Sequence, residues 1–368
     1  MGVLILSCRT GAGHDSCAKA IKEIYDIHGA TCDICDSLGF TSQSFSNIVS
    51  RGHVAIYRYT PKLFEIGYDF SEKHPAVLDE HSPAYHLLAS GTGKLRKHIL
   101  DNGYDTVICT HVFAGMLVNQ MMKKTPLPIK TAFVATDYTC YPGLSSCKMD
   151  RYFLPAPALV AQYAAEGIEP EKLSVSTIPI RQNMYVHKPK AVAKKKFGIQ
   201  ENSTHLVMMS GSMGCGPVKE LAVSLSRQLQ PDQEMTVVCG TNRRLRKALQ
   251  EKLEKQENVH ILGFVTDMSQ LLDSADLYVT KPGGLSTSEA FAKNLPMAFI
   301  QAVAGCETYN RQFFVDMGAA VSAKNVEELS DLCVTLLSDR NRLTAMSQAM
   351  ATCEKKNAAQ YVYDTLNL

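Results

Sequence analysis

The stretch from Thr280 to Ala290, TKPGGLSTSEA, constrains the fold more than any other part of the sequence. An apolar run from Leu277 to Val279 precedes it and predicts a buried parallel strand. A proline and two glycines then end the strand, because proline cannot donate to the ladder and glycine adopts backbone conformations that other residues avoid. We expect Ser286 to cap a helix that carries Glu289 in its first turns. The pattern is typical of a turn that directs backbone N–H groups and a helix dipole at an anion, usually a phosphate.

Glu289 refines this interpretation. Its carboxylate would repel a lone phosphate but suits the hydroxyls of a ribose, so a whole nucleotide explains the stretch better than a phosphate alone. An ordinary strand-to-helix turn of an α/β domain is the alternative, and this segment by itself leaves it open.

Length and charge limit the class of protein. The chain has 368 residues, more than one domain usually holds, so two domains are expected. Its residues are 45% hydrophobic and 20% charged, which is typical of a globular protein with hydrophobic cores. The net charge of +2 argues against a dedicated nucleic-acid-binding protein, which would carry a basic excess, but it leaves room for local basic patches.

The 12 cysteines are scattered through predicted strands and helices, where free cysteine packs as a small hydrophobic residue. This pattern, with no basic leader before the first strand, favours a reduced, cytoplasmic protein. Cys32 and Cys35 have the spacing of a metal-binding pair, but they lie in a predicted strand, face opposite sides, and no second pair follows. We therefore expect no metal site. No apolar run is long enough to span a bilayer, so any membrane contact is expected to be peripheral.

The N-terminal part predicts a β-α-β unit with a glycine-rich turn. A strand from Val3 to Ser7 leads into the turn Thr10-Gly11-Ala12-Gly13-His14. A helix is expected from about Ser16 to Ile27, followed by a strand from Thr31 to Asp36. The dinucleotide fingerprint would need a third glycine where Ser16 stands, although Asp36 could serve as its acidic ribose ligand. An NAD site is therefore weakened but stays open.

Three polar side chains follow predicted strands in this half of the chain. His14 lies in the first glycine turn, His111 follows a strand from Thr106 to Thr110, and Asp137 follows a strand from Lys130 to Val134. Ligand-binding groups of parallel sheets gather at such carboxyl ends. His14 is explained equally well as a capping or packing residue and as a general base at the edge of a cleft.

Two segments have a basic character. Residues 40–100 are expected to be helical, and around Tyr57 aromatic and aliphatic residues alternate with basic ones such as Arg58 and Lys62. That pattern suits an interface with anionic lipid, while an ordinary core-facing helix with a solvated basic side is an equal alternative. The segment from Lys188 to Lys196 is predicted most simply to be a polar linker between domains, and basic contact with a membrane is a second possibility.

The second half of the chain begins with a strand from Leu206 to Met209, a loop from Ser210 to Pro217 and a helix from Val218. This is a second turn of the kind that holds phosphate. It lacks the Lys-Ser/Thr ending of a P-loop, so ATPase chemistry is disfavoured. Phe264, after a strand from Val259 to Leu262, could face a planar base.

These blocks, in this order, resemble the processive diacylglycerol glycosyltransferases and the plant-type monogalactosyldiacylglycerol synthases. They are more distantly similar to the bacterial enzyme that adds N-acetylglucosamine to peptidoglycan lipid. The resemblance runs almost end to end and is carried by Thr10-Gly11-Ala12-Gly13-His14, Thr136-Asp137, Gly211-Ser212-Met213-Gly214, Thr280 to Ser286, Ser288-Glu289-Ala290, and Gly305-Cys306-Glu307 with Asn310.

The resemblance implies a GT-B architecture: an α/β fold with two facing Rossmann-like domains, parallel sheets and an inter-domain cleft. The expected domains are an acceptor and membrane-facing domain at residues 1–183 and a UDP-sugar-binding domain at residues 184–352. A C-terminal helix at residues 353–368 would cross back to the first domain.

The resemblance also implies site residues by position. Donor-binding residues would be Gly211, Ser212 and Met213 at the diphosphate, Phe264 at uracil, Gly283, Gly284 and Ser286 at the phosphates, Glu289 at the ribose, and Glu307 and Asn310 at the sugar. Gly11, Ala12 and Gly13 would form an acceptor or phosphate loop. Cys306 stands where the family usually has glutamine, and Tyr138 stands where it usually has histidine, so the sugar and the details of the acceptor site stay open.

The implied reaction is an inverting transfer of a hexose from UDP-glucose or UDP-galactose to diacylglycerol, at the anionic cytoplasmic face of a membrane. His14 would remove the hydroxyl proton, with His111 and Asp137 orienting the base or the acceptor. Backbone amides and helix N-termini would stabilise the leaving diphosphate, so no metal and no cofactor beyond the UDP-sugar co-substrate is expected, and no nucleic acid. Two alternatives are an enzyme like UDP-N-acetylglucosamine 2-epimerase and a non-catalytic UDP-sugar sensor that binds a partner protein.

Overall fold

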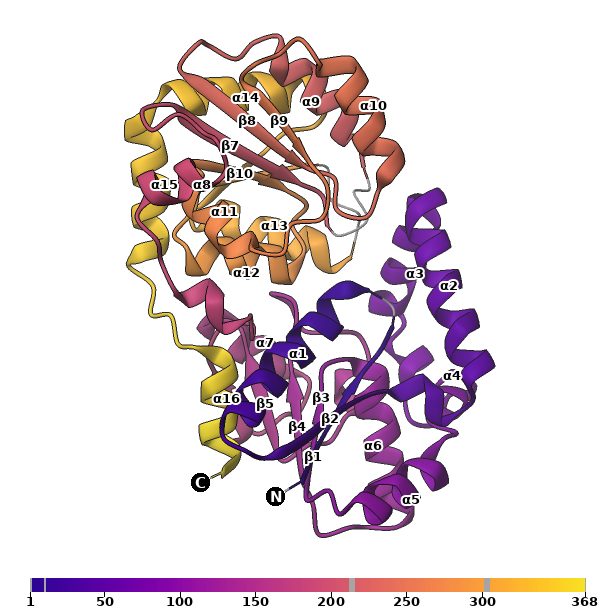
Figure 1. Cartoon of the computed structure of the whole chain (residues 1–368). Coiled ribbons are helices and arrows are strands. Elements are labelled where there is room, and N and C mark those ends of the chain that lie inside the picture. The colour runs from indigo at the N-terminus through magenta and orange to yellow at the C-terminus, as the bar shows by residue number, and fades with distance from the viewer. Residues whose placement is uncertain (1, 10, 212–215, 301–304, 368) are drawn as a thin grey trace. The chain divides into compact units, whose positions relative to one another are not determined.

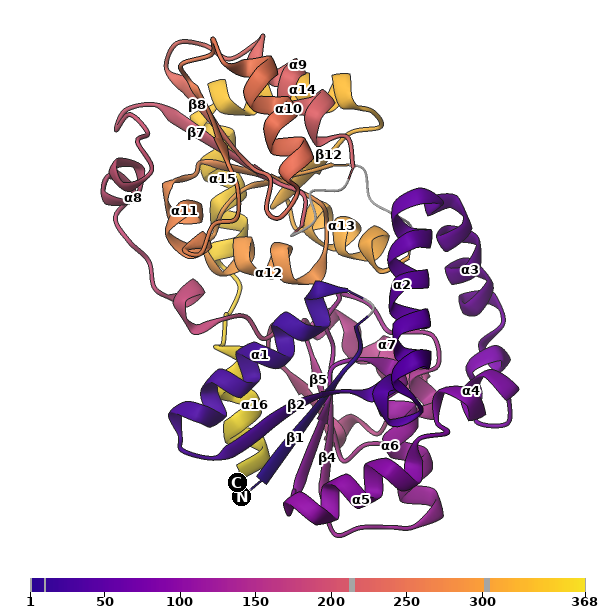
Figure 2. The ribbon, with the colours of Figure 1, turned by 45° about the vertical axis from the view of Figure 1, so that its right-hand side comes forward.

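The structure is a computed structural model of the whole chain, and it describes residues 2–9, 11–211, 216–300 and 305–367 (Figures 1 and 2). The chain divides into two compact units. Unit 1 comprises Met1–Gln182, Val303–Cys306 and Lys355–Leu368, and unit 2 comprises Asn183–Ala302 and Glu307–Glu354.

Unit 1 is built on a six-stranded parallel sheet in the order β2-β1-β3-β4-β5-β6. Its strands are β1 (Gly2–Ser7), β2 (Thr31–Asp36), β3 (Thr106–Cys109), β4 (Lys130–Val134), β5 (Arg151–Leu154) and β6 (Leu173–Val175). Every residue of β1 and β3 is buried, as expected of central strands covered on both faces. The strand order reverses between β1 and β3, and such a reversal opens a crevice at the carboxyl ends of the strands.

The helices of unit 1 connect these strands. They are α1 (Ala12–Ile27), α2 (Gln43–Tyr59), α3 (Pro61–Lys73), α4 (Pro83–Leu88), α5 (Thr92–Asn102), α6 (Val112–Lys124), α7 (Val160–Ala165) and α16 (Ala358–Asn367). Figures 1 and 2 show α2 and α3 side by side, as a helical hairpin to one side of the sheet.

The last helix, α16, belongs to unit 1 and packs on α1. The Tyr363 ring stacks on His28 with ring centroids 4.0 Å apart and meets Tyr25 edge-on at 5.0 Å. Lys130 Nζ donates to the carbonyl oxygen of Leu366 at 2.6 Å, which supplies a partner for one of the last carbonyls of the helix. The C-terminal segment thus forms part of the core of unit 1.

Unit 2 holds a second six-stranded parallel sheet, in the order β12-β11-β10-β7-β8-β9. Its strands are β7 (Thr204–Met209), β8 (Gln233–Val238), β9 (Val259–Leu262), β10 (Leu277–Thr280), β11 (Met297–Phe299) and β12 (Ala320–Ser322). The order reverses between β7 and β10, so the glycine turns that follow these two strands lie at the point of reversal, where ligands of such sheets bind. The associated helices are α8 (Lys190–Lys196), α9 (Val218–Ser226), α10 (Arg243–Leu253), α11 (Met268–Ser274), α12 (Gly284–Ala292), α13 (Cys306–Asp316), α14 (Val326–Ser338) and α15 (Arg340–Ala351).

The linker predicted from Lys188 to Lys196 is wrong. Residues 190–196 form the helix α8, which packs on α11 within unit 2. Lys194 is only 4% exposed, and its Nζ donates to the carbonyl oxygens of Ser203 at 2.6 Å and Glu201 at 3.1 Å. The basic composition was misleading because a lysine can bury its apolar stem while its ammonium group bonds to backbone carbonyls.

The structure also bears on the expectations about the cysteines and about membrane-spanning helices. The eleven cysteines in the part of the chain that the structure describes are free thiols, and Cys32 and Cys35 lie on β2. Among the described residues, no helix combines the length and the apolar character that crossing a bilayer requires.

The core of unit 2 contains one buried histidine. His205 on β7 is 0% exposed, and its Nε2 lies 2.8 Å from Thr236 Oγ1. Its Nδ1 lies 3.1 Å from Ser274 Oγ and 3.2 Å from the Ser274 carbonyl oxygen. Burial lowers the pKa of His205 to about 4, against the smaller raising effects of the Ser274 bond and of Asp276.

This histidine predicts an acid-sensitive unit 2. The folded-state pKa lies below the unfolded value of 6.5, so protonation favours the unfolded chain and stability is lost as pH falls from 6.5 towards 4. The loss attributable to His205 should approach about 3 kcal/mol at the acid end. Urea unfolding of the wild type and of His205→Gln at several pH values measures it, with His81→Gln, an exposed histidine, as the control. An equal acid slope in wild type and His205→Gln would show that His205 is not the cause.

Candidate functional site

Three side chains that the sequence singled out come from the carboxyl edge of the unit 1 sheet. His14 follows β1, His111 follows β3, and Asp137 follows β4. The helix α1 begins at Ala12 rather than at about Ser16, because the turn after β1 needs only Gly11 as the N-cap before the chain becomes helical. His14 therefore lies in the first turn of α1, directly at the reversal of strand order, and the predicted loop residues Ala12 and Gly13 are helical too.

The surroundings of His14 fix where its proton lies. Nδ1 is 2.8 Å from the carbonyl oxygen of Thr110 and 2.9 Å from Thr136 Oγ1. Because a carbonyl oxygen can only accept a hydrogen bond, Nδ1 must carry the hydrogen, which leaves the lone pair on Nε2. Burial lowers the pKa of His14, and the Thr110 bond and the charge of Asp15 oppose that shift. The result is a neutral imidazole whose Nε2 can accept a proton.

Asp137 is linked to His14 through two hydroxyl groups rather than directly. Tyr141 OH donates to Asp137 Oδ2 at 3.0 Å and lies 2.9 Å from Thr136 Oγ1. The Thr136 N–H also donates to the Tyr141 oxygen at 2.9 Å. Burial and the charge of Asp137 raise the pKa of Tyr141 well above its usual value, so the phenol stays protonated and can donate. Tyr141 is the link that sequence reasoning missed, since nothing local to it marks a contact with the first turn of α1.

His111 combines a structural task with a place beside His14. It is the N-cap of α6, where its Nδ1 accepts the N–H of Phe113 at 3.0 Å. Its ring meets the His14 ring edge-on, with centroids 4.6 Å apart. Since its Nδ1 is an acceptor, the hydrogen of the neutral ring is on Nε2. His111 is therefore both the cap of α6 and a direct neighbour of His14.

In unit 2 the glycine turn after β10 leads straight into a helix. The N-cap of α12 is Gly283, and no side chain caps the helix, so the prediction that Ser286 caps it is wrong. The strand β10 ends at Thr280, and α12 begins at Gly284, directly after Pro282 and Gly283, so Ser286 falls inside the first turn. The backbone N–H groups of that first turn have no intrahelical acceptor, and no N-cap oxygen is supplied to them. They are available to an anion.

Side chains from α13 hold this turn from behind. Asn310 is 0% exposed, and its Nδ2 donates to the Pro282 carbonyl oxygen at 2.9 Å. Glu307 Oε1 pairs with Lys281 Nζ at 3.1 Å, and both side chains are largely buried. These two residues, for which sugar contact was predicted, thus also fix the backbone of the turn. Their contact with a sugar stays a prediction.

The remaining donor residues lie at the same edge or near it. Gly211 follows β7 with a φ of 63°, a left-handed conformation that glycine adopts without strain. Ser212 and Met213 lie outside the described residues. Glu289 lies in α12 and is half-buried, and its charge adds to burial in raising the pKa of Tyr278. Phe264 follows the edge strand β9 and is 68% exposed, which leaves its ring accessible.

The side chains that commonly bind metal ions do not cluster in the described part of the chain. Within the described ranges, no group of three or more His, Cys, Asp or Glu side chains has an arrangement that could hold a metal ion.

Family comparisons assign the two halves of the chain separately. Residues 14–180 match the family described as monogalactosyldiacylglycerol (MGDG) synthase, and residues 217–352 match glycosyl transferases group 1. The processive diacylglycerol beta-glucosyltransferase of Bacillus pumilus (strain SAFR-032) is 28% identical over 373 residues, which cover 99% of this chain and 94% of that protein.

Solved structures show the fold. MurG of Acinetobacter baumannii matches with a TM-score of 0.67 and 16% identity, over 99% of this chain and 98% of that one. UDP-GlcNAc 2-epimerase from Neisseria meningitidis bound to UDP-GlcNAc matches with a TM-score of 0.60 and 15% identity, over 100% of both chains. The predicted α/β fold of GT-B type, with two Rossmann-like domains, is confirmed. The cleft expected between the domains stays a prediction.

The geometry of His14 predicts a specific tautomer. Nitrogen-15 NMR of the imidazole at pH 7 should show a protonated Nδ1 and an unprotonated Nε2, with a pKa below 6.5. In Thr136→Val the tautomer should persist, because the Thr110 carbonyl still accepts from Nδ1. A hydrogen on Nε2 in the wild type would contradict the assignment.

Proposed function

We propose, from the premise that this chain belongs to the family of monogalactosyldiacylglycerol synthases and processive diacylglycerol glucosyltransferases, that it makes a glycolipid by transferring a hexose from a UDP-sugar to the hydroxyl of diacylglycerol. The observation that carries the proposal is the neutral His14 at the reversal of strand order, with its proton fixed on Nδ1 by Thr110 and Nε2 left to accept another.

The reaction step is an inverting displacement. The acceptor oxygen attacks the anomeric carbon, the bond from that carbon to the diphosphate breaks, and the hydroxyl proton passes to His14 Nε2. Inversion is supported by the name of the relative from Bacillus pumilus, because a beta-glucoside arises from an α-linked UDP-sugar only with inversion. Asp137 would hold the base through Tyr141 and Thr136, and so act as a positioning residue rather than as the base.

The leaving diphosphate would be held in unit 2. The uncapped first turn of α12 offers backbone N–H groups and the positive end of a helix dipole, and Gly211 follows the neighbouring strand β7. Fixed N–H groups of this kind stabilise the negative charge that develops on the departing phosphate. We propose that they do so without a metal ion or a further cofactor. Glu289 would then bind the ribose and Phe264 the uracil.

The donor sugar is proposed to be glucose or galactose. The relative whose name specifies glucose matches 99% of the chain, whereas the galactose-specific family description matches residues 14–180. Those residues lie in unit 1, while the proposed donor site lies in unit 2, so glucose has the broader support. UDP release with a panel of UDP-sugars, with and without diacylglycerol in anionic vesicles, tests the choice.

Contact with the membrane is proposed to run through α3. Leu63, Ile66 and Phe70 lie on one helix face and are 55%, 65% and 52% exposed. Such an apolar stripe is costly in water and gains by entering the interface of a bilayer, where a diacylglycerol acceptor resides. The side chains of Tyr57, Arg58 and Lys62, which the sequence placed in this contact, lie outside what the structure describes. The cytoplasmic face of a membrane stays the proposed location.

The alternatives have narrower support. The likeness to UDP-GlcNAc 2-epimerase shows the fold alone, at 15% identity. A non-catalytic sensor would not need a histidine whose tautomer is fixed by a backbone carbonyl. Neither alternative needs the exposed stripe of α3.

Removal of the proposed base should slow the chemistry and spare donor binding. His14→Ala is expected to lower kcat by about 10²- to 10⁴-fold, the range typical of a lost general base. UDP affinity, measured by calorimetry, should change less than about twofold, since the proposed diphosphate site is in unit 2. His81→Ala, at an exposed histidine, is the control. Turnover by His14→Ala close to that of wild type would refute the assignment.

Loss of the apolar stripe should weaken membrane binding. The double variant Ile66→Ser/Phe70→Ser is expected to reduce co-sedimentation with anionic vesicles at least about tenfold, because burying each such side chain is worth about 1.5–3 kcal/mol. Ile27→Ser on α1 removes a side chain that is 66% exposed elsewhere in unit 1 and serves as the matched control. Equal losses in the two variants would contradict the role of α3.

A further inference from the structure

A polar cavity lies in unit 2, at the ends of the strands opposite to the glycine turns. It has a volume of about 790 Å³ and is lined by residues at the amino ends of β7, β10 and β11, including Thr204, Asp276 and Pro296. The turns at Gly211 and Gly283 follow the carboxyl ends of β7 and β10. Since β7 and β10 are parallel neighbours, the cavity and the turns are at opposite ends of the same strands. The cavity is therefore separate from the proposed donor site.

Positive charge exceeds negative charge in the lining of this cavity. Three acidic side chains line it, Glu201, Asp273 and Asp276, against five basic ones, Lys188, Lys190, Lys194, Lys293 and Arg340. The whole chain carries a net charge of only +2, so the cavity concentrates an excess that the rest of the surface does not show. A concave, partly desolvated surface with an excess of positive charge attracts negatively charged ligands.

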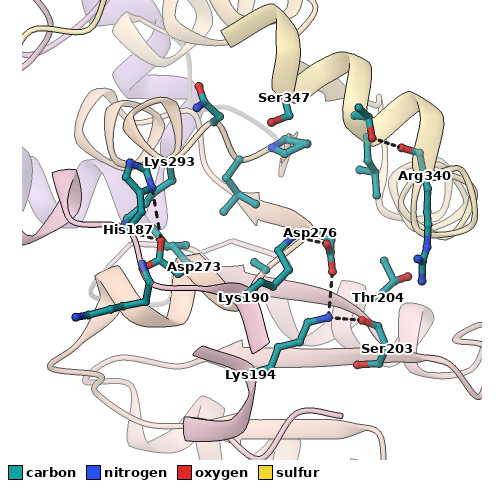
Figure 3. Close-up of a pocket in the computed structure, with 18 of the residues that line it drawn as sticks. His187, Lys190, Lys194, Ser203, Thr204, Asp273, Asp276, Lys293, Arg340 and Ser347 are labelled. Atoms are coloured by element: carbon teal, nitrogen blue, oxygen red, sulfur yellow. Dashed lines mark hydrogen bonds and ion pairs between the residues drawn. The ribbon is translucent and has the colours of Figure 1, made fainter. Parts of the chain in front are cut away.

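The two aspartates are already engaged by fixed donors. Asp276 Oδ1 pairs with Lys190 Nζ at 2.5 Å (Figure 3). Its Oδ2 accepts the backbone N–H of His205 at 2.8 Å. Asp273 Oδ1 pairs with Lys293 Nζ at 2.8 Å. The first pair holds α8, the second joins α11 to the end of α12, and together they neutralise two of the lysines.

Arg340 is not neutralised in this way. It extends from the start of α15 towards Thr204, as Figure 3 shows. Its hydrogen bond goes to the carbonyl oxygen of Asn202 at 3.5 Å, and within the described part of the chain no carboxylate lies in ion-pair range of it. Arginine has five N–H donors in a planar fork that matches two oxygens of a phosphate. Ser347, further along the same helix α15, contributes a hydroxyl group to the lining of this cavity.

The positive charge of the cavity also acts on Lys194, a buried lysine in its lining. Burial lowers the pKa of Lys194, Asp276 opposes the shift, and the positive charges of Lys190 and Arg340 lower the pKa further. An anion beside Arg340 would offset part of this positive charge.

We propose that this cavity binds the phosphate group of a small phosphate ester, with Arg340 as its cationic ligand. A volume of about 790 Å³ lies within the range of small-molecule sites and accommodates an ester larger than phosphate itself. Hydroxyl and amide groups of Ser347 and Gln348 on α15 suit the hydroxyls of such a ligand. The phosphate comes from a free metabolite or from a phospholipid head group, which share this chemistry. The inference does not depend on the proposed function.

Calorimetry with glycerol phosphate tests the proposal. The full chain is first saturated with UDP, so that the proposed donor site is filled, and glycerol phosphate is then added at constant ionic strength. Saturable binding is expected in the wild type, and Arg340→Gln should weaken it by at least about fivefold, because a charge-assisted bond is lost. Arg342→Gln, on the same helix and outside the cavity lining, should bind as the wild type does. Arg340→Lys keeps the charge and should retain part of the affinity.

A vesicle arm distinguishes the two sources of phosphate. Co-sedimentation with phosphatidylglycerol vesicles, against phosphatidylcholine vesicles, is measured for the same variants. Dependence on Arg340 in the vesicle arm assigns a head group, and dependence in the calorimetric arm assigns a free ester. If Arg340→Gln and Arg342→Gln behave alike in both arms, or if the wild type shows no saturable binding in either arm, the proposal is overturned.

Discussion

Thr110 joins the two features on which the unit 1 site depends. Its N–H donates to the Leu6 carbonyl oxygen at 3.0 Å, which extends the pairing of β3 with β1 beyond the end of the strand. Its own carbonyl oxygen accepts from His14 Nδ1 at 2.8 Å. One residue thus extends the pairing of the two strands and fixes the tautomer of the histidine. Without it, Nδ1 would have only the Thr136 hydroxyl, which can donate as well as accept and so would not decide which nitrogen carries the proton.

In unit 2, the glycine turn after β10 is likewise fixed by neighbouring residues that leave its N–H groups unused. Asn310 satisfies the Pro282 carbonyl from the buried side, and the pair of Lys281 with Glu307 ties α13 to the turn. Because side chains hold the turn from behind, the N–H groups of the first turn of α12 are not consumed by its own cap. A site that must stabilise negative charge gains from donors that are fixed before the ligand arrives, since no reorganisation is then required.

The two edges of the unit 2 sheet carry different chemistry. At the carboxyl ends of the strands, glycines and backbone N–H groups lie where the strand order reverses between β7 and β10. At the amino ends, Lys190 anchors α8 through Asp276, Lys293 pairs with Asp273, and Arg340 bonds to a backbone carbonyl instead. The first arrangement suits a ligand held close to the backbone, and the second suits a charged group recognised by side chains.

The sequence by itself determined the parallel strands, their order along the chain and the positions of the glycine turns, because these follow from apolar runs and from the backbone freedom of glycine and proline. It also placed His14, His111 and Asp137 at strand ends. It failed at Ser286, since Gly283 already serves as the N-cap and places Ser286 inside the helix, and at α8, where charge concealed burial. Only the tertiary structure decided the tautomer of His14, the link through Tyr141 and the cavity beside Arg340. Each depends on groups far apart in sequence, such as His14 and Thr110 with a separation of 96 residues, and no local pattern records which distant groups the fold brings within hydrogen-bond distance.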